Sequence, residues 1–127
     1  MKMLDPMNLQ RHSSPYQKMA FSTARRKKIK KPDGYGRNSG QCVDTVEMFI
    51  SVEQVIFKKV TYKTDGCITT NACAATVSQM AEGKKIDIAW DITPEKVILY
   101  LKTLPMSGAH CAELTVGALY KALASLS

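Results

Sequence analysis

The sequence predicts an α+β fold, in which a short antiparallel sheet of about three strands packs against C-terminal helices. Three observations support this. Hydrophobic alternation typical of strands runs through residues 45–64, in two segments that only two residues separate. From residue 69 onward, the apolar spacing and the capping residues are typical of helices. At 127 residues, the chain is also long enough to bury the core of one domain without disulfides.

The two strand segments are expected to form a hairpin. In "TVEMFISV", Val46, Met48 and Ile50 alternate with more polar residues and fall on one face. "VIFKKVTYKT" is a second β-rich run, close enough for a tight turn between the two. The preceding segment, "KPDGYGRNSGQC", contains one proline and three glycines, and it predicts an irregular loop.

Three helices are expected after the hairpin. Thr69 or Thr70 can cap "TNACAATVSQMAE", and Gly83 follows its end. Thr93 can cap the next helix, "DITPEKVILYLKTLP", which has a proline at its first helical position. The third helix is expected at about residues 109–126. Its apolar stripe would consist of Cys111, Leu114 or Thr115, Ala118 or Ala122, Leu119, Leu123 and Leu126.

Positive charge is concentrated in the first quarter of the chain. Residues 1–31 contain nine Lys or Arg and one acid, whereas residues 32–127 have a net charge of −1. We therefore expect a basic, flexible N-terminal arm at 1–31 and one folded domain at 32–127. A run such as "ARRKKIKK" can bind nucleic acid, although most such runs are solvated segments. An organellar targeting segment is disfavoured because a clean amphipathic period is missing.

The four cysteines indicate a site other than a disulfide framework. No secretory signal or membrane-spanning run is apparent, so a cytoplasmic protein without membrane association is expected. In a reducing compartment, cysteines are more often metal-binding or catalytic than disulfide-bonded. None of the four forms a C-x-x-C pair, so any shared site must be assembled by the fold.

Two of the cysteines lie where a helix is expected to begin. Cys67 follows Asp65-Gly66, and the partial positive charge of a helix N-terminus lowers the pKa of a thiol. A small buried hydrophobic residue is an equally good interpretation. Cys111 lies in the first turn of the last helix, beside His110. Adjacent helical residues point about 100° apart, so only one of this pair can face the core.

The other two cysteines differ in setting. Cys42 lies at the junction of loop and strand, and Asp44 would point to the same side in an extended chain. A thiolate and a carboxylate side by side suit a metal ion, although Asp44 could equally bond nearby backbone N–H groups. Cys73 lies in mid-helix and is interpreted as a packing residue.

Three segments resemble the IscU/NifU N-terminal family of iron–sulfur cluster scaffold proteins. They are "GQCVDT", "TYKTDGC" and "LPMSGAHCAE", and the similarity covers about residues 32–126. The resemblance implies that Cys42, Cys67 and Cys111 bind the cluster and accept sulfur. It implies that Asp44 keeps the cluster labile and that His110 lies near the fourth ligand position.

The resemblance also implies a function and partners. The protein would assemble a cluster, 2Fe–2S in the first instance, and transfer it to recipient apoproteins without being an enzyme. A cysteine desulfurase would supply the sulfur as persulfide. Zinc could occupy the same site in the isolated protein. Formation of a homodimer is compatible with the resemblance. Met106, Ser107 and Gly108 depart from the family's pattern, which argues against recognition by its specialised Hsp70 chaperone. Val43 replaces a glycine of the family.

Three alternatives stay open at the level of sequence. The same residues could form a zinc-binding sulfur-transfer protein that accepts persulfide. The basic run could make the chain a nucleic-acid-binding module. The departures from the family's pattern could also mark a regulatory or degenerate relative that builds no cluster.

Overall fold

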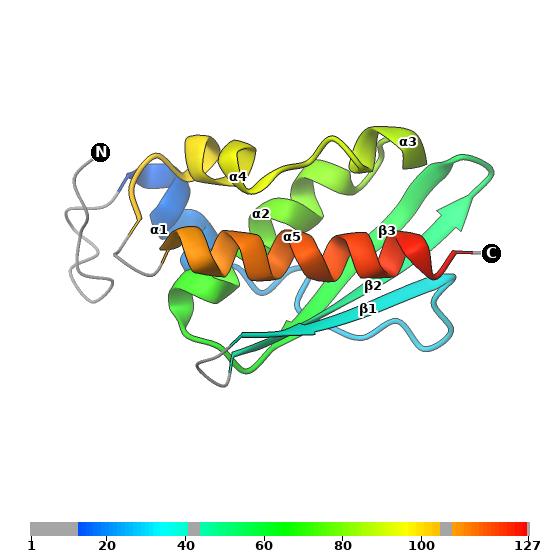
Figure 1. Ribbon diagram of the computed structural model, residues 1–127, viewed down its shortest axis with the longest axis horizontal. Helices are drawn as coiled ribbons and strands as arrows, with labels where there is room; N and C mark the ends of the chain where they lie inside the picture. Colours follow the sequence, from blue (N-terminus) through cyan, green and yellow to red (C-terminus); the bar gives the residue numbers. More distant parts are fainter. Residues whose placement is uncertain (1–12, 41–43, 105–107, 127) are drawn as a thin grey trace.

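One three-stranded antiparallel sheet supports five helices in the computed structural model, which describes residues 13–40, 44–104 and 108–126 (Figure 1). The elements in chain order are α1 (Ser14–Ala20), β1 (Gly34–Ser39), β2 (Thr45–Glu53), β3 (Ile56–Thr64), α2 (Ile68–Ala81), α3 (Ile86–Ala89), α4 (Pro94–Leu101) and α5 (Gly108–Ala124). The strand order is β1-β2-β3. Helix α5 packs on β1 and β2, α2 packs on β3 and α5, and α4 packs on α5 and α2. The predicted α+β class with a short antiparallel sheet is confirmed.

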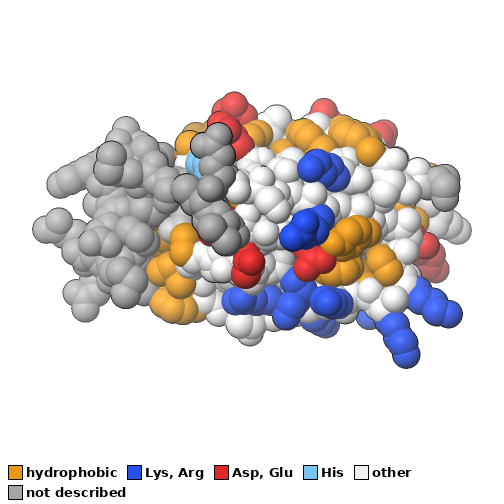
Figure 2. Space-filling view, turned by 60° about the horizontal axis from the view of Figure 1, so that its bottom comes forward, with side chains coloured by type: hydrophobic (Ala, Val, Ile, Leu, Met, Phe, Trp, Pro, Cys, Tyr) orange, Lys and Arg blue, Asp and Glu red, His pale blue; other side chains and the backbone are white. Residues whose placement is uncertain are grey.

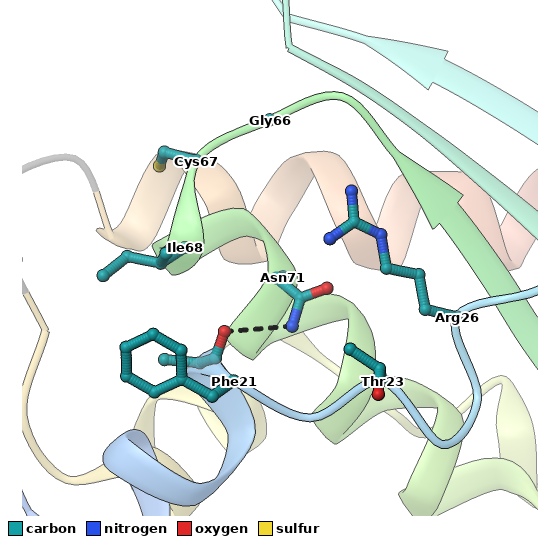
Figure 3. A pocket seen from close by; sticks show the side chains of 8 residues that line it. Phe21, Thr23, Arg26, Gly66, Cys67, Ile68 and Asn71 are labelled. Atoms are coloured by element: carbon teal, nitrogen blue, oxygen red, sulfur yellow. Dashed lines mark hydrogen bonds between the residues drawn. The ribbon is translucent and has the colours of Figure 1, made fainter.

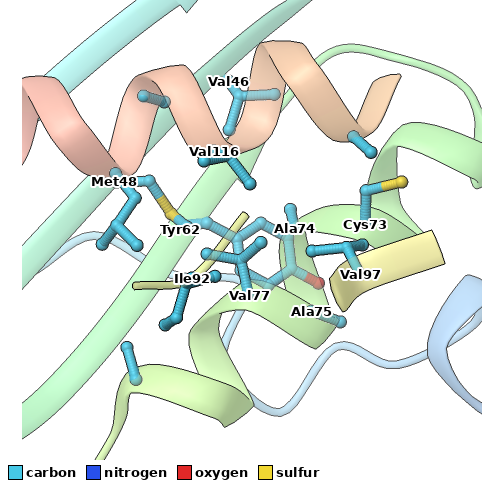
Figure 4. Packing of buried hydrophobic residues seen from close by; sticks show 14 of the residues in the cluster. Val46, Met48, Tyr62, Cys73, Ala74, Ala75, Val77, Ile92, Val97 and Val116 are labelled. Carbon is cyan, nitrogen blue, oxygen red and sulfur yellow. The ribbon is translucent and has the colours of Figure 1, made fainter. Parts of the chain in front are cut away.

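The predicted hairpin is formed by β2 and β3. Their register pairs Met48 with Tyr62 and Ile50 with Val60 across the two strands. Val46, Met48 and Ile50 are fully buried, as the alternation predicts. Their side chains meet those of α2, α4 and α5 in the core between the sheet and the helices (Figure 4).

The first strand lies in the segment that we expected to be an irregular loop. Residues Gly34–Ser39 pair with β2 along their whole length. A Cβ atom at Gly36 would lie 2.2 Å from the carbonyl oxygen of Ala118, and one at Gly34 would lie 2.6 Å from that of Ala122. These glycines therefore let the backbone of α5 approach the sheet closely, rather than marking turns.

The helices agree largely with the sequence. Thr93 accepts a hydrogen bond from a backbone N–H of α4, and Gly83 follows α2 with a left-handed φ of 84°. The predicted cap of α2 was wrong: α2 begins earlier, with Cys67 rather than Thr69 or Thr70 at the N-cap. The helix expected at about 109–126 is α5, and the one-turn helix α3 was not predicted.

The described part of the expected basic arm is folded rather than flexible. Tyr16 and Met19 of α1 are buried, and the Tyr16 hydroxyl lies 2.8 Å from the Thr69 hydroxyl of α2. Further along, Arg25 forms an ion pair with Glu82 at 2.7 Å. The boundary at residue 31 thus does not separate arm from domain within residues 13–31. Residues 1–12 lie outside the described part of the chain.

The basic residues after α1 belong to the surface of the domain. Arg26 pairs with Tyr62 in an isolated parallel bridge beside β3, and the chain then continues to β1. The side chains of Lys27, Lys28, Lys30 and Lys31 are exposed. On the face of the molecule drawn in Figure 2, Lys and Arg side chains gather mainly along the lower side, and carboxylates lie among them.

Both outer edges of the sheet have hydrogen-bond partners. On β3, the backbone N–H of Tyr62 donates to the carbonyl oxygen of Arg25 at 2.9 Å. On β1, the backbone N–H of Tyr35 donates to the Ser125 hydroxyl, just beyond α5, also at 2.9 Å. None of the described helices is long and apolar enough to cross a membrane.

Candidate metal centre

Three predicted ligands converge at one end of the sheet. Asp44 directly precedes β2, Cys67 caps α2, and Cys111 lies in the first turn of α5. One carboxylate oxygen and the two sulfur atoms all lie within 4.8 Å of one another. The fold thus brings together side chains from three distant segments, as the absence of any local cysteine pair required.

The Cys67 thiol lies at the start of α2 and is exposed. Burial of part of the side chain raises its pKa, but hydrogen bonding by the backbone and hydroxyl of Thr70, and then by Thr69, outweighs this. The net effect is a pKa below the ordinary value for cysteine. The Cys67 side chain makes no capping hydrogen bond of regular geometry, so its interaction with these groups is long or poorly aligned.

A hollow of about 180 Å³ lies beside Cys67 (Figure 3). Phe21, Arg26 and Asn71 line it together with the start of α2. The Asn71 side-chain amide donates to the carbonyl oxygens of Met19, Ala20 and Ser22, so it ties the segment after α1 to α2. The wall of this hollow is consequently held in place.

Cys111 and His110 face opposite environments, as the helical geometry requires. Cys111 is only 2% exposed, whereas His110 is exposed. A Cβ atom at Gly40 would lie 3.0 Å from the Nε2 atom of His110, so the imidazole lies against the chain at Gly40. That point is where the chain enters residues 41–43, although His110 is not itself grouped with the three converging ligands.

The two remaining cysteines of the chain are Cys42 and Cys73. Cys42 and its neighbour Val43 lie outside the described residues, as do Met106 and Ser107. Cys73 is completely buried in α2, and burial raises its pKa well above the ordinary value. The interpretation of Cys73 as a packing residue is confirmed.

Sequence reasoning missed one member of the site. Thr70 is fully buried, and its hydroxyl oxygen lies 3.3 Å from Asp44 Oδ2, 3.4 Å from Cys111 Sγ and 3.8 Å from Cys67 Sγ. The sequence signal was its position three residues after Cys67, which places both side chains on one side of a helical turn. The sequence predicts Thr70 only as a possible helix cap.

The donor set fits a thiophilic metal ion or an iron–sulfur cluster. Thiolates bind zinc and iron at about 2.3 Å, so two sulfurs in a tetrahedral site stand about 3.8 Å apart. Atoms within 4.8 Å of one another therefore need to close by only about 1 Å. A carboxylate beside two thiolates mixes a hard ligand with soft ones.

Comparison with known proteins shows the family to which the chain belongs. Residues 20–127 match the family described as the NifU-like N-terminal domain. The chain belongs to this family. It is 32% identical over 97 residues to two proteins of Archaeoglobus fulgidus, the iron–sulfur cluster assembly scaffold proteins IscU 1 and IscU 2. The match covers 76% of this chain but only 63% of each relative.

Solved structures show the same fold. A putative iron–sulfur cluster assembly scaffold protein for the SUF system, from Fervidobacterium islandicum, superposes with a TM-score of 0.75 at 14% identity. The superposition covers 91% of this chain and 98% of that one. The N-terminal part of a NifU-like protein from Brucella abortus gives a TM-score of 0.57 at 16% identity, covering 90% and 83%. At these identities the likeness concerns the fold alone.

Proposed function

We propose that the protein is a scaffold on which iron and sulfide assemble into an iron–sulfur cluster, 2Fe–2S in the first instance, for transfer to apoproteins. The observation that carries this proposal is the convergence of Asp44, Cys67 and Cys111 at one end of the sheet, where their ligand atoms lie within 4.8 Å of one another. Family membership and the printed names of the two Archaeoglobus relatives support it.

Cys42, Cys67 and Cys111 would be the thiolate ligands of the cluster. Asp44 and His110 are the candidates for the fourth position, and the His110 ring lies against the backbone at Gly40, two residues before Cys42 in the sequence. The cluster is cargo, so the site must release it. A hard oxygen or a nitrogen ligand among thiolates, in a site that is partly exposed at Cys67, favours release over a buried four-cysteine site.

Cys67 is the proposed sulfur acceptor, because its thiol is exposed and its pKa is lowered. The Cys67 thiolate would attack the outer sulfur of a persulfide carried by a cysteine desulfurase. A new S–S bond would form on Cys67, the S–S bond of the donor would break, and the donor would leave as a thiolate. The protein itself is proposed to be a carrier rather than an enzyme, and the reducing cytoplasm suits its thiols.

Anaerobic reconstitution tests the proposal. The purified protein is supplied with iron, cysteine and a cysteine desulfurase, and iron, sulfide and zinc per chain are measured beside the visible spectrum. Wild type and Cys73→Ala should gain sulfur-to-iron charge-transfer bands with equal iron and sulfide. Cys42→Ala, Cys67→Ala and Cys111→Ala should fail, with Cys73→Ala as the matched control because that thiol is completely buried and is not among the converging ligands.

The zinc-binding alternative uses the same three converging side chains. A chain that holds one zinc ion, accepts persulfide sulfur on Cys67 and takes up no cluster would be a sulfur-transfer protein. Uptake of neither metal would refute both functions. Nucleic-acid binding through the exposed lysines after α1 would then be the remaining hypothesis, and salt-dependent binding of nucleic acid would test it.

A further inference from the structure

The hydroxyl of Thr70 occupies the centre of the candidate metal site. Its oxygen is within hydrogen-bonding range of the Asp44 carboxylate and of the sulfurs of Cys67 and Cys111. Thr70 has no exposed surface, so its hydroxyl finds its partners within the protein. A single polar atom of the protein thus touches all three side chains that the fold brings together.

A hydroxyl has one proton to donate and two lone pairs that accept. The Thr70 proton can go to Asp44 or to Cys111, while a lone pair can accept from the Cys67 thiol. The hydroxyl therefore links a carboxylate and two thiols without requiring a metal.

We propose that Thr70 is a positioning residue that keeps Asp44, Cys67 and Cys111 converged in the metal-free protein and thereby regulates metal uptake. The proposal rests on the proposed function, because it concerns the same site. Hydrogen-bond partners of metal ligands orient those ligands, and their removal typically lowers metal affinity about 10- to 100-fold. The Thr70 hydroxyl is in contact with all three ligands and donates its proton to one of them at a time.

The position of the Thr70 side chain requires a glycine, Gly66, directly before Cys67. A Cβ atom at Gly66 would lie 2.7 Å from both Cβ and Oγ1 of Thr70. Any larger residue at position 66 would push the Thr70 side chain away from the three donors. The Gly66-Cys67 pair thus serves two purposes, since the cysteine supplies a ligand and the glycine leaves room for the hydroxyl that orients it.

Cobalt(II) titration of the metal-free protein tests this role, because thiolate-to-cobalt charge-transfer bands report both affinity and ligand geometry. Thr70→Val replaces the hydroxyl by a methyl group of similar size, and Thr70→Ser keeps the hydroxyl. Thr70→Ala provides a second variant without the hydroxyl. The melting temperature of each metal-free variant checks that the fold is retained.

We expect Thr70→Val and Thr70→Ala to bind cobalt about 10-fold more weakly than wild type, with shifted charge-transfer bands. Thr70→Ser should restore affinity and spectrum to within about twofold of wild type. Equal or tighter binding by the variants that lack the hydroxyl would overturn the role of Thr70 while leaving the scaffold function intact. A wild type that binds no cobalt would instead overturn both, so the two failures are distinguishable.

Discussion

Replacing Gly36 by alanine should destabilise the protein strongly, because the backbones of β1 and α5 meet there. The new Cβ atom would lie 2.2 Å from the carbonyl oxygen of Ala118 and 2.4 Å from the backbone nitrogen of Ala122. An ordinary van der Waals contact needs more than 3.4 Å, so the helix must move outward by about 1 Å. Overpacking of this kind costs about 1–3 kcal/mol, and occasionally more. Since both clashing atoms belong to backbone, we expect about 3 kcal/mol.

Urea denaturation of the metal-free protein measures this change as a lower midpoint at an unchanged slope. Gly40→Ala is the matched control. Its Cβ would lie 3.0 Å from the end of the exposed His110 side chain, which can rotate away, and at an ordinary contact distance of 3.8 Å from Leu114 Cδ1. The control should lose less than about 1 kcal/mol. If Gly36→Ala proved as stable as the control, the close approach of α5 to β1 would not be what requires a glycine there.

Three further predictions concern the site and its supports. Iodoacetamide at neutral pH should modify Cys67 well before Cys73. Cys67 is exposed and its pKa is lowered, whereas burial raises the pKa of Cys73. Peptide mass mapping that found Cys73 modified first would contradict this prediction. Asp44→Ala should retain a reconstituted cluster longer against a chelator, because it removes the proposed hard ligand; faster loss of the visible bands would count against that role. Thr93→Ala should cost about 1 kcal/mol of unfolding free energy, through loss of the hydrogen bond from the Lys96 N–H, and an unchanged urea midpoint would show that this cap is unimportant.

The elements that the sequence predicted well are those specified by local patterns. The alternation at Val46, Met48 and Ile50 and the short turn determine the hairpin, although the turn lies at residues 54–55, one residue later than the predicted Glu53-Gln54. Thr93 and Gly83 mark helix ends through interactions within a few residues. Such signals are local, so one sequence suffices to find them.

The elements that were missed depend on contacts between distant segments. Gly34 and Gly36 resemble turn residues until α5 is placed on β1, and only then does the need for two small residues in a strand become apparent. Helix α1 is too short to be predicted from its period, and its burial comes from packing on α2.

The same distinction applies to the candidate site. Cys67 and Cys111 could be singled out because each lies at a helix start, which is a local property. The role of Thr70 could not, since a threonine in the first turn of a helix is common and its meaning here depends on Asp44 and Cys111 arriving from elsewhere in the chain. The family resemblance supplied the ligands but not this hydroxyl.

The hydrogen bonds along the sheet's outer edges limit how this protein can associate. Because Arg25 occupies the edge of β3 at Tyr62 and Ser125 occupies the edge of β1 at Tyr35, an incoming strand finds those backbone groups already bonded. Extension of the sheet by another chain, the common route to strand-mediated aggregation and to peptide recognition at a sheet edge, is therefore blocked at these points. At these two points, a protein that binds the sheet edge can contact side chains and helix ends rather than free backbone groups. The sulfur donor and recipient apoproteins of the proposed function would find an accessible thiol at the end of the molecule where Cys67 is exposed.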